Sequence, residues 1–349
     1  MNKFNVIDFG AVPDGVTDST GAIQAALDKA SVSGGDVIIP SGRFSVSRLH
    51  LKGKSVALIG TAAWGFNDDG GSVLILNDPN VDCLLDITGG FGCSVRGISF
   101  NGQKLGENIH GIKLYWDKYN GGSEEDSPTI DECRIGSFTG NGVHFEHVWC
   151  FTLRHSMLHR NYGAGLFIDG WDAFILDNWI TANRGGGITG GETACSITAT
   201  GNRIEWNKTA GVLIPDGCCI NLTGNYIDRS FGPAVNLGGG KNVDAITMTG
   251  NIFYRSGALK DGDSFSDEYL NSHIYMTGVK GITITGNSFR IGRSDGGKGN
   301  ISPNYSVVMG DSENCVIMGN TLYNGQVLEP MIEFGKNKDC VISGNTGNR

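Results

Sequence analysis

The sequence predicts an all-β fold, a single right-handed parallel β-helix with an N-terminal capping α-helix. The first observation behind this prediction is a phrase, T-G-N-x-Φ, in which Φ is a large apolar residue. Its full copies recur about every 23 residues, and about every 36 where a loop intervenes, as expected when each repeat is one coil of a solenoid. The copies are TGNRI (200–204), TGNYI (223–227), TGNIF (249–253) and TGNSF (285–289), with weaker ones in LDNWI (176–180), MGNTL (318–322) and SGNT (343–346).

The asparagine of each copy marks a bend, and its amide is expected to hydrogen-bond along the stack of coils. Alternation along a strand turns the residue two positions later into the core. The predicted ladder is Asn178, Asn202, Asn225, Asn251, Asn287, Asn320 and Asn345. The predicted inward residues are Ile180, Ile204, Ile227, Phe253, Phe289 and Leu322.

A second column of small residues supports the same register. It precedes the strand before each asparagine, and its members tolerate burial, so a buried column is predicted. The members are Cys150, Ala173, Cys195, Cys219, Ala245, Gly281, Cys315 and Cys340.

Composition suits short strands joined by tight turns, because 55 of the 349 residues are glycine. A solenoid needs no division, so residues 1–349 are predicted to form one domain. The net charge of −9 argues against a nucleic-acid partner. No apolar run is long enough for a membrane span, and no leader is visible, which favours the cytoplasm unless a leader was removed. The nine cysteines are predicted to be reduced thiols packed in the core, with no metal ligands among them.

The first 46 residues are predicted to contain a strand, the capping helix and the first coil. The strand is expected at 6–9, and Asp18 is a suitable N-cap for the helix that follows. One stripe of that helix is apolar, and an open β-helix end needs such a cover. The stripe consists of Ala22, Ile23, Ala26, Leu27 and Ala30.

The segments VIDFGAVPDGVTDSTGAIQAAL and GGDVIIPSGRFSV (34–46) resemble the start of pectate-lyase-like β-helix proteins. That superfamily includes polygalacturonase-like hydrolases, β-helix lyases, inulin fructotransferases and tail-spike depolymerases. The resemblance implies a carbohydrate substrate and, often, a homotrimer. The NTD, GHG and RIK strings of the polygalacturonases and the WIDH segment of the lyases are missing, so no single activity is implied.

Segments 102–128, 255–273 and 290–305 interrupt the coil period and are predicted to be inserted loops. Loops of solenoids project from one side, often the binding side. Their aromatic residues are expected either to wall a sugar cleft or to shield coil edges; they are Tyr115, Trp116, Tyr119, Phe265, Tyr269 and Tyr305.

Aligning the coils on the inward residue brings Glu205 and Asp228 to neighbouring coils, about 4.8 Å apart along the stack. Repulsion between two close carboxylates keeps a proton on one of them, which supplies the acid and the base or nucleophile of glycosidic cleavage. This pair is the first candidate catalytic site. The alternative is a structural charge ladder in which Arg203 and Arg229 neutralise both carboxylates.

Neighbouring outward positions carry side chains suited to sugars. Aromatic rings can stack on sugar faces, and basic groups can bond hydroxyls or a uronate. The predicted substrate-binding residues are His159, Trp179, Arg203, Tyr226, Tyr254 and Arg290.

A second candidate pair, Glu146 and Asp169, follows from the alignment of Val143 with Leu166 as inward residues. His144 and His147 lie beside it in the sequence. This pair is predicted either to take part in chemistry or to face a neighbouring subunit. His155 and His159 are four residues apart, but on a strand rather than a helix, so no metal site is predicted there.

The predicted function is that of a carbohydrate-active enzyme, a glycoside hydrolase or an intramolecular glycosyl transferase using two carboxylates and no cofactor. One alternative is a polysaccharide lyase acting on a uronate polymer, with calcium or arginine neutralising the substrate carboxylate. Another is a non-catalytic glycan-binding or tail-spike-like module. No nucleic-acid or membrane partner is expected, and a homotrimer is favoured.

Overall fold

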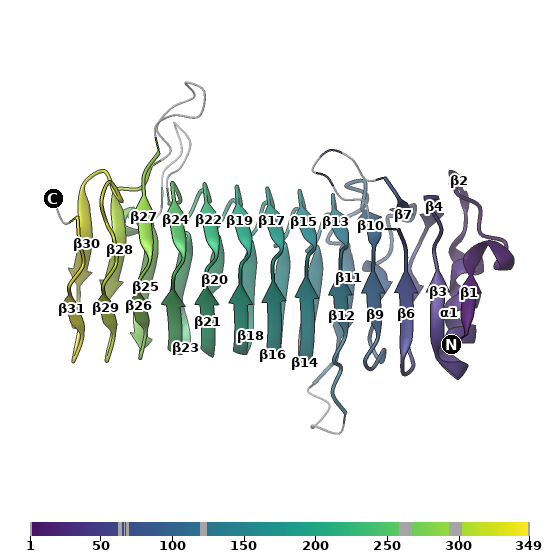
Figure 1. Cartoon of the computed structure of the whole chain (residues 1–349), viewed down its shortest axis with the longest axis horizontal. Helices are drawn as coiled ribbons and strands as arrows, with labels where there is room; N and C mark the ends of the chain where they lie inside the picture. Colours follow the sequence, from purple (N-terminus) through teal and green to yellow (C-terminus); the bar gives the residue numbers. More distant parts are fainter. Residues whose placement is uncertain are drawn as a thin grey trace. The chain divides into compact units, whose positions relative to one another are not determined.

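The computed structural model describes residues 2–61, 65, 67, 70–118, 124–257, 265, 267–292 and 302–347. They form two compact units, Met1–Trp179 and Ile180–Arg349. In each unit the strands pair in parallel with the corresponding strands of the next coil, as Figure 1 shows within each unit. The prediction that 1–349 acts as one domain stays a prediction.

The strands of the first unit belong to two sheets. The first sheet contains β1 (Lys3–Asn5), β3 (Gly35–Ile38), β5 (Leu49–His50), β6 (Val56–Ile59), β8 (Cys83–Asp86), β9 (Ser94–Arg96), β11 (His110–Tyr115), β12 (Thr129–Asp131), β14 (Val143–Arg154) and β16 (Leu166–Leu176). The second contains β2 (Asp14–Asp18), β4 (Gly42–Val46), β7 (Ser72–Leu76), β10 (Ile98–Asn101), β13 (Arg134–Gly136) and β15 (Met157–His159).

The second unit repeats this plan, and β17 (Trp179–Thr181) spans the division between the units. Its first set of strands is β18 (Ile188–Thr200), β20 (Val212–Ile214), β21 (Gly217–Thr223), β23 (Val235–Thr249), β25 (Ser272–Lys280), β26 (Thr283–Thr285), β28 (Tyr305–Gly310), β29 (Val316–Met318), β30 (Glu329–Phe334) and β31 (Val341–Ser343). The other set is β19 (Arg203–Glu205), β22 (Tyr226–Asp228), β24 (Ile252–Tyr254) and β27 (Ser288–Arg290).

The predicted inward residues form the core of the second unit. All six are at most 2% exposed, from Ile180 to Leu322. Their strands pair in register, with Ile204 opposite Ile227 and Phe253 opposite Phe289. The inward column of the repeat is therefore confirmed.

The predicted asparagine ladder is confirmed from Asn202 to Asn345. Each Oδ1 accepts hydrogen bonds from the backbone N–H and the Nδ2 of the asparagine one coil earlier, at 2.9–3.0 Å. From Asn225 to Asn345, each Nδ2 also donates to a backbone oxygen, as Asn251 does to Leu222. Backbone N–H and C=O groups at these bends are thus hydrogen-bonded by asparagine side chains.

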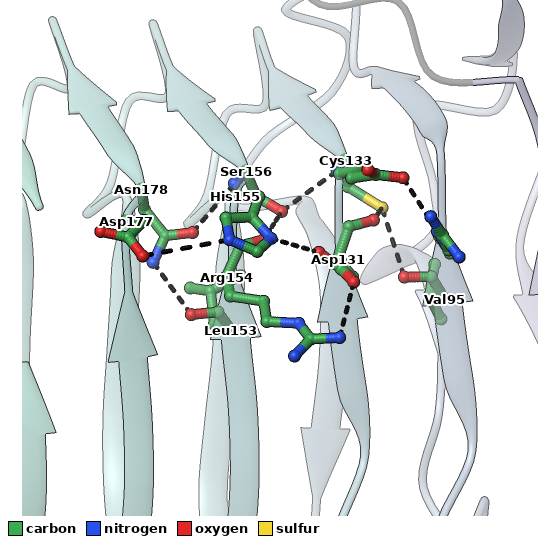
Figure 2. A network of polar contacts seen from close by, with 11 residues as sticks. Val95, Asp131, Cys133, Leu153, Arg154, His155, Ser156, Asp177 and Asn178 are labelled. Carbon is green, nitrogen blue, oxygen red and sulfur yellow. Dashed lines mark hydrogen bonds and ion pairs between the residues drawn. The ribbon is translucent and has the colours of Figure 1, made fainter. Parts of the chain in front are cut away.

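In the first unit, Asn178 occupies the same bend, and the smaller side chains of Ser156 and Cys133 occupy it in the two preceding coils, as Figure 2 shows. The N–H of Ser156 donates to Oδ1 of Asn178, and the N–H of Cys133 donates to Oγ of Ser156. Beside this column, the Asp131 carboxylate accepts from His155 Nδ1 at 3.0 Å and from Arg154 at 2.9 Å. Although burial opposes it, these two donors hold the pKa of Asp131 below its usual value.

A further ladder, not foreseen from the sequence, runs along the opposite bend. The backbone N–H and Nδ2 of Asn183 both donate to Oδ1 of Asn207. At the same bend the N–H of Ser230 donates to Oγ of Ser256. In these coils, side chains therefore hydrogen-bond to the backbone at two bends rather than one.

The predicted column of small buried residues is wrong in part, because it mixes the column at the bend with the columns just before and just after it. The true column has φ between 51° and 62°, the left-handed region, so the chain turns there between two strand segments. Its members are Cys150, Asp172, Ser196, Cys219, Ala245, Gly281, Asn314 and Asp339. Cys219 and Ala245 are exposed rather than buried. The prediction of buried thiols is confirmed for Cys83, Cys93, Cys133 and Cys315 and is wrong for Cys219, although all nine cysteines are free.

The N-terminus differs in detail from the prediction. Residues Val6–Phe9 form the 3-10 helix η1 rather than a strand. Gly10, which has a positive φ, ends this helix. Helix α1 (Thr20–Ser33) begins after Ser19, and Asp18 accepts instead from the N–H and hydroxyl of Thr20. Ile23, Ala26, Leu27 and Ala30 are buried as predicted, whereas Ala22 is not.

The predicted loop 102–128 is wrong at its centre, where β11 forms a regular strand between β8 and β14. The described parts of 255–273 and 290–305 lie between strands as predicted, except at their ends, where β25, β27 and β28 extend into them. The 3-10 helix η2 (Glu268–Leu270) lies in the first of these segments. Tyr119 lies outside the described residues. Within the described parts of the chain, no helix combines the length and apolar character of a membrane span.

Candidate functional site

One outward face of the first unit carries ionisable side chains on three successive coils. In β11, β14 and β16 a column of apolar residues that includes Ile112, Val143 and Leu166 is buried inward, and the residues next to it face outward. Strand pairing aligns the outward residues in two columns, with a step of about 4.8 Å. The columns are Lys113, His144 and Phe167, and Tyr115, Glu146 and Asp169; we call them the β11–β14–β16 face.

The predicted alignment of Glu146 with Asp169 is therefore confirmed. The side chain of Glu146 is 32% exposed, and Asp169 is 7% exposed. Among the residues that the structure describes, the groupings of possible metal ligands do not include either carboxylate. Their role in chemistry or at a subunit contact stays a prediction.

A chain of hydrogen bonds orients Glu146. Oδ1 of Asn141 accepts from the backbone N–H of Ala164 at 2.7 Å, so its Nδ2 donates to Nδ1 of His144 at 2.8 Å. A neutral His144 then carries its proton on Nε2, which lies 3.3 Å from Oε2 of Glu146. Burial lowers the pKa of His144, against the opposing effect of Glu146, and keeps the ring neutral near pH 7.

His147 occupies a bulge in β14, where the pairing with β16 shifts and φ is 57°. Its Nδ1 lies 2.7 Å from the carbonyl oxygen of Trp116, which can only accept, so Nδ1 carries the proton. That tautomer makes Nε2 the basic nitrogen. The bulge therefore supplies a proton acceptor at the edge of the β11–β14–β16 face.

Lys113 and Tyr115 border this histidine and carboxylate group. Nζ of Lys113 is 2.9 Å from the Asp82 carboxylate and 4.8 Å from the centre of the Tyr115 ring. Tyr115 is 37% exposed. The face thus combines a cation, a phenol, two imidazoles and two carboxylates. Side chains of these kinds can bind an anionic substrate and transfer protons to and from it.

His110 stacks on His144 with ring centres 4.2 Å apart, and its Nδ1 accepts from the N–H of Asn141 at 2.9 Å. Burial, aided by the charges of His144 and Lys113, lowers the pKa of His110 to about 3. Burial likewise lowers the pKa of His273, in β25, to about 3.

Acid is therefore expected to destabilise the protein through these two histidines. Their folded pKa lies below the unfolded value, so their contribution is complete above pH 6.5 and is lost as the pH falls toward 3. Going from pH 7 to 4.5 is expected to cost about 2.5 kcal/mol per histidine. Urea unfolding at both pH values checks this, and His110→Gln should flatten the dependence; an unchanged slope would contradict it.

The first candidate pair has the predicted alignment, because Glu205 lies directly opposite Asp228 on the next coil. Both are buried, at 4% and 0% exposure. Nε of Arg203 donates to Glu205 at 2.9 Å, and Asp228 pairs with Arg229 and lies 3.7 Å from Nε of Arg255. Each carboxylate thus has a guanidinium counterion, as in the structural alternative stated above.

The other predicted binding residues divide by exposure. His159 is 1% exposed and packs over Gly136. Arg203 and Arg290 are exposed, and Tyr226 and Tyr254 are half-buried. Arg203 lies over the Tyr226 ring at 5.1 Å, and Arg255 lies over the Tyr254 ring at 4.2 Å. Trp179 is half-buried, and its backbone N–H donates to the carbonyl oxygen of Ser156.

Sequence reasoning missed Lys113 and Asn141. Lys113 lies in the segment GIKLY, whose alternation of apolar and polar residues predicts a strand, but the segment was assigned to a loop. Asn141 acts through a side-chain contact three residues along the chain, for which no sequence signal exists.

The family-level comparisons agree with this architecture. A family described as the right-handed beta helix region matches residues 96–253 and 191–348, and one described as rhamnogalacturonase A/epimerase, pectate lyase-like, matches residues 3–77. The chain belongs to the right-handed parallel β-helix family. The resemblance inferred from the sequence is confirmed.

Mannuronan C5-epimerase AlgE1 of Azotobacter vinelandii is 29% identical over an alignment of 199 residues that covers 52% of this chain and 14% of the relative. Alginate lyase 7 of the same organism is 27% identical over an alignment of 207 residues that covers 52% of this chain and 22% of that protein. The chain therefore spans only a small part of the length of these two relatives.

Two solved structures share the fold over nearly the whole chain. The A-module of mannuronan C-5 epimerase AlgE4 from A. vinelandii aligns with a TM-score of 0.73 and 20% identity over 98% of this chain and 99% of that chain. DFA-IIIase from Arthrobacter chlorophenolicus A6 aligns with a TM-score of 0.68 and 12% identity over 97% and 93%. The relatives and neighbours of this β-helix are carbohydrate-modifying enzymes.

Proposed function

We propose that this β-helix protein removes the C5 proton of a uronate residue in an anionic polysaccharide, at the β11–β14–β16 face. The observation that carries the proposal is the joint placement of Lys113, His147 and the hydrogen-bonded His144–Glu146 pair on adjacent coils. The named relatives support it, since they include epimerases of mannuronan and an alginate lyase.

Lys113 is the group proposed to bind the substrate carboxylate. The C5–H bond next to a carboxylate is weakly acidic, and a cation beside that carboxylate stabilises the negative charge that develops on it. Asp82 pairs with Lys113 at 2.9 Å and holds the ammonium in place before substrate arrives. A net charge of −9 on the chain makes such local positive charge important for binding an anionic polymer.

Nε2 of His147 is proposed to accept the C5 proton, because the Trp116 carbonyl fixes the tautomer in which this nitrogen is basic. The electrons of the C5–H bond move into the carboxylate as an enediolate. The Tyr115 hydroxyl then donates a proton to C5 from the other face, which gives the C5 epimer. When the electrons instead form a C4–C5 double bond, the glycosidic oxygen leaves with that proton and the chain is cleaved.

Glu146 is proposed to orient the substrate hydroxyls and to steady the histidines, since His144 Nε2 donates to it. Hydrolysis by Glu205 and Asp228, the first expectation from the sequence, has weaker support. Both carboxylates are buried and each has an arginine counterion. A nearby guanidinium favours the charged form of a carboxylate, whereas a general acid needs the protonated form.

Incubation with polymannuronate, polyguluronate and polygalacturonate in deuterated water tests the proposal. The expected result is deuterium at C5 of at least one polymer, measured by NMR spectroscopy. Ultraviolet absorbance of an unsaturated product distinguishes elimination from epimerisation. New reducing ends without deuterium or unsaturation would overturn the proposal and favour hydrolysis.

A further inference from the structure

A second group of reactive side chains lies in the other unit, on β18 and β21. The sulfur atoms of Cys195, Cys218 and Cys219 all lie within 4.8 Å of one another, and Cys195 Sγ is 2.6 Å from Cys218 Sγ. Cys195 and Cys218 are half-buried, and Cys219 is exposed. The group therefore borders solvent.

The backbone explains how two consecutive cysteines reach one place. Cys218 lies directly opposite Cys195 on the neighbouring coil. In a regular strand Cys219 would face the other way. Its φ of 55° places it at the left-handed bend, which turns its side chain to the side of Cys218.

We propose that Cys195, Cys218 and Cys219 form a three-thiolate site for a thiophilic d10 cation such as Zn²⁺. A tetrahedral zinc ion with Zn–S bonds of about 2.3 Å requires sulfur atoms about 3.8 Å apart. The three sulfur atoms are already confined within 4.8 Å, so side-chain rotation alone can bring them to that spacing.

The neighbouring coil offers a place for the fourth ligand. Asp244 of β23 lies directly opposite Cys218, on the side away from Cys195. It is exposed, so either its carboxylate or a water molecule can complete the coordination. This site is independent of the uronate chemistry proposed above.

The chain contains a matched control. Cys315 and Cys340 also face each other on adjacent coils, but only as a pair, because no third cysteine joins them among the described residues. A pair of thiolates without a third is expected to hold zinc far more weakly. Comparing the two groups separates a three-ligand site from the general affinity of thiols for metal.

The test uses the full chain, reduced and stripped of metal, titrated with Zn²⁺ against a chromogenic chelator and with Cd²⁺ for its thiolate charge-transfer band. One equivalent is expected to bind, and Cys219→Ser is expected to weaken binding about 100-fold or more. The double variant Cys315→Ser and Cys340→Ser should bind as the unchanged protein does. Bound zinc should also protect the three cysteines from alkylation.

Binding that survives Cys219→Ser at full strength, or is lost in the Cys315 and Cys340 variant, would overturn the proposal. So would the absence of a stoichiometric metal. A Cys195–Cys218 disulfide in protein purified without reductant, found by peptide mass spectrometry together with no zinc binding after reduction, would show that the group is a redox pair instead.

Discussion

Replacing His147 by glutamine is expected to lower kcat/KM for C5 proton exchange on a uronate polymer by about 10²- to 10⁴-fold, the usual contribution of a general base. Glutamine can still donate to the Trp116 carbonyl, which His147 Nδ1 approaches at 2.7 Å. The bulge should therefore keep its shape while the proton acceptor is lost. Deuterium incorporation at C5 measures the effect, and circular dichroism checks that the variant is folded.

Two further substitutions extend this test, one on the β11–β14–β16 face and one outside it. Lys113→Met keeps the length of the side chain but removes the cation, and is expected to reduce turnover by about 10²- to 10³-fold. Glu132→Gln is the control for loss of a charged side chain outside the β11–β14–β16 face, because Glu132 is 38% exposed and bound to Arg96. It should leave the rate unchanged.

Glu205→Gln decides between the two carboxylate pairs. Its partner Arg203 has a 54% exposed side chain, so loss of the ion pair should cost little stability. Full activity in this variant with little in His147→Gln assigns the chemistry to the β11–β14–β16 face. The reverse pattern would contradict the proposal and restore the hydrolase interpretation.

The repeat predicted the parts of the fold that depend on backbone periodicity. Inward residues such as Ile204 and Phe253, and the ladder through Asn225 and Asn251, follow from a spacing that every coil must respect. The alignments of Glu205 with Asp228 and of Glu146 with Asp169 follow in the same way, since one residue fixes the register of a whole coil.

The environment of each outward side chain did not follow from that register. Asp228 is buried beside Arg229 and Arg255, which come from two different coils, and only the folded chain shows how they surround it. Tautomers also depend on contacts that periodicity does not contain. Asn141 fixes the proton position on His144 because Ala164 first fixes Asn141.

Single residues in the left-handed conformation account for the errors in the predicted column of small buried residues. Cys219 and Ala245 were expected to be buried because they are small, but both occupy the bend between strand segments, where the chain turns with positive φ. A non-glycine residue in that conformation carries little sequence signal. That turn also brings Cys219 beside Cys218, so the thiol group was not foreseen for the same reason.

Replacing Asn251 by leucine is expected to lower the free energy of unfolding by about 3–5 kcal/mol, because several buried groups lose their partners together. Oδ1 of Asn251 accepts from the N–H and Nδ2 of Asn225, while its Nδ2 donates to the Leu222 carbonyl and to Asn287 Oδ1. Leucine has nearly the same size, so little of the loss comes from a cavity. Urea unfolding with an unchanged m-value measures the effect.

The ladder provides its own graded comparison. Asn251→Ser is expected to cost about half as much, because Ser156 fills the corresponding bend of the first unit and its Oγ both accepts from Cys133 and donates to the Arg154 carbonyl. Asn345→Leu, on the half-exposed last rung, is expected to cost about 1 kcal/mol, since water can replace the lost amide there. Equal losses at Asn251 and Asn345 would show that the ladder contributes through local turn geometry rather than through buried hydrogen bonds. A buried interior rung that costs more than an exposed terminal one is the result that stacked, desolvated amides require.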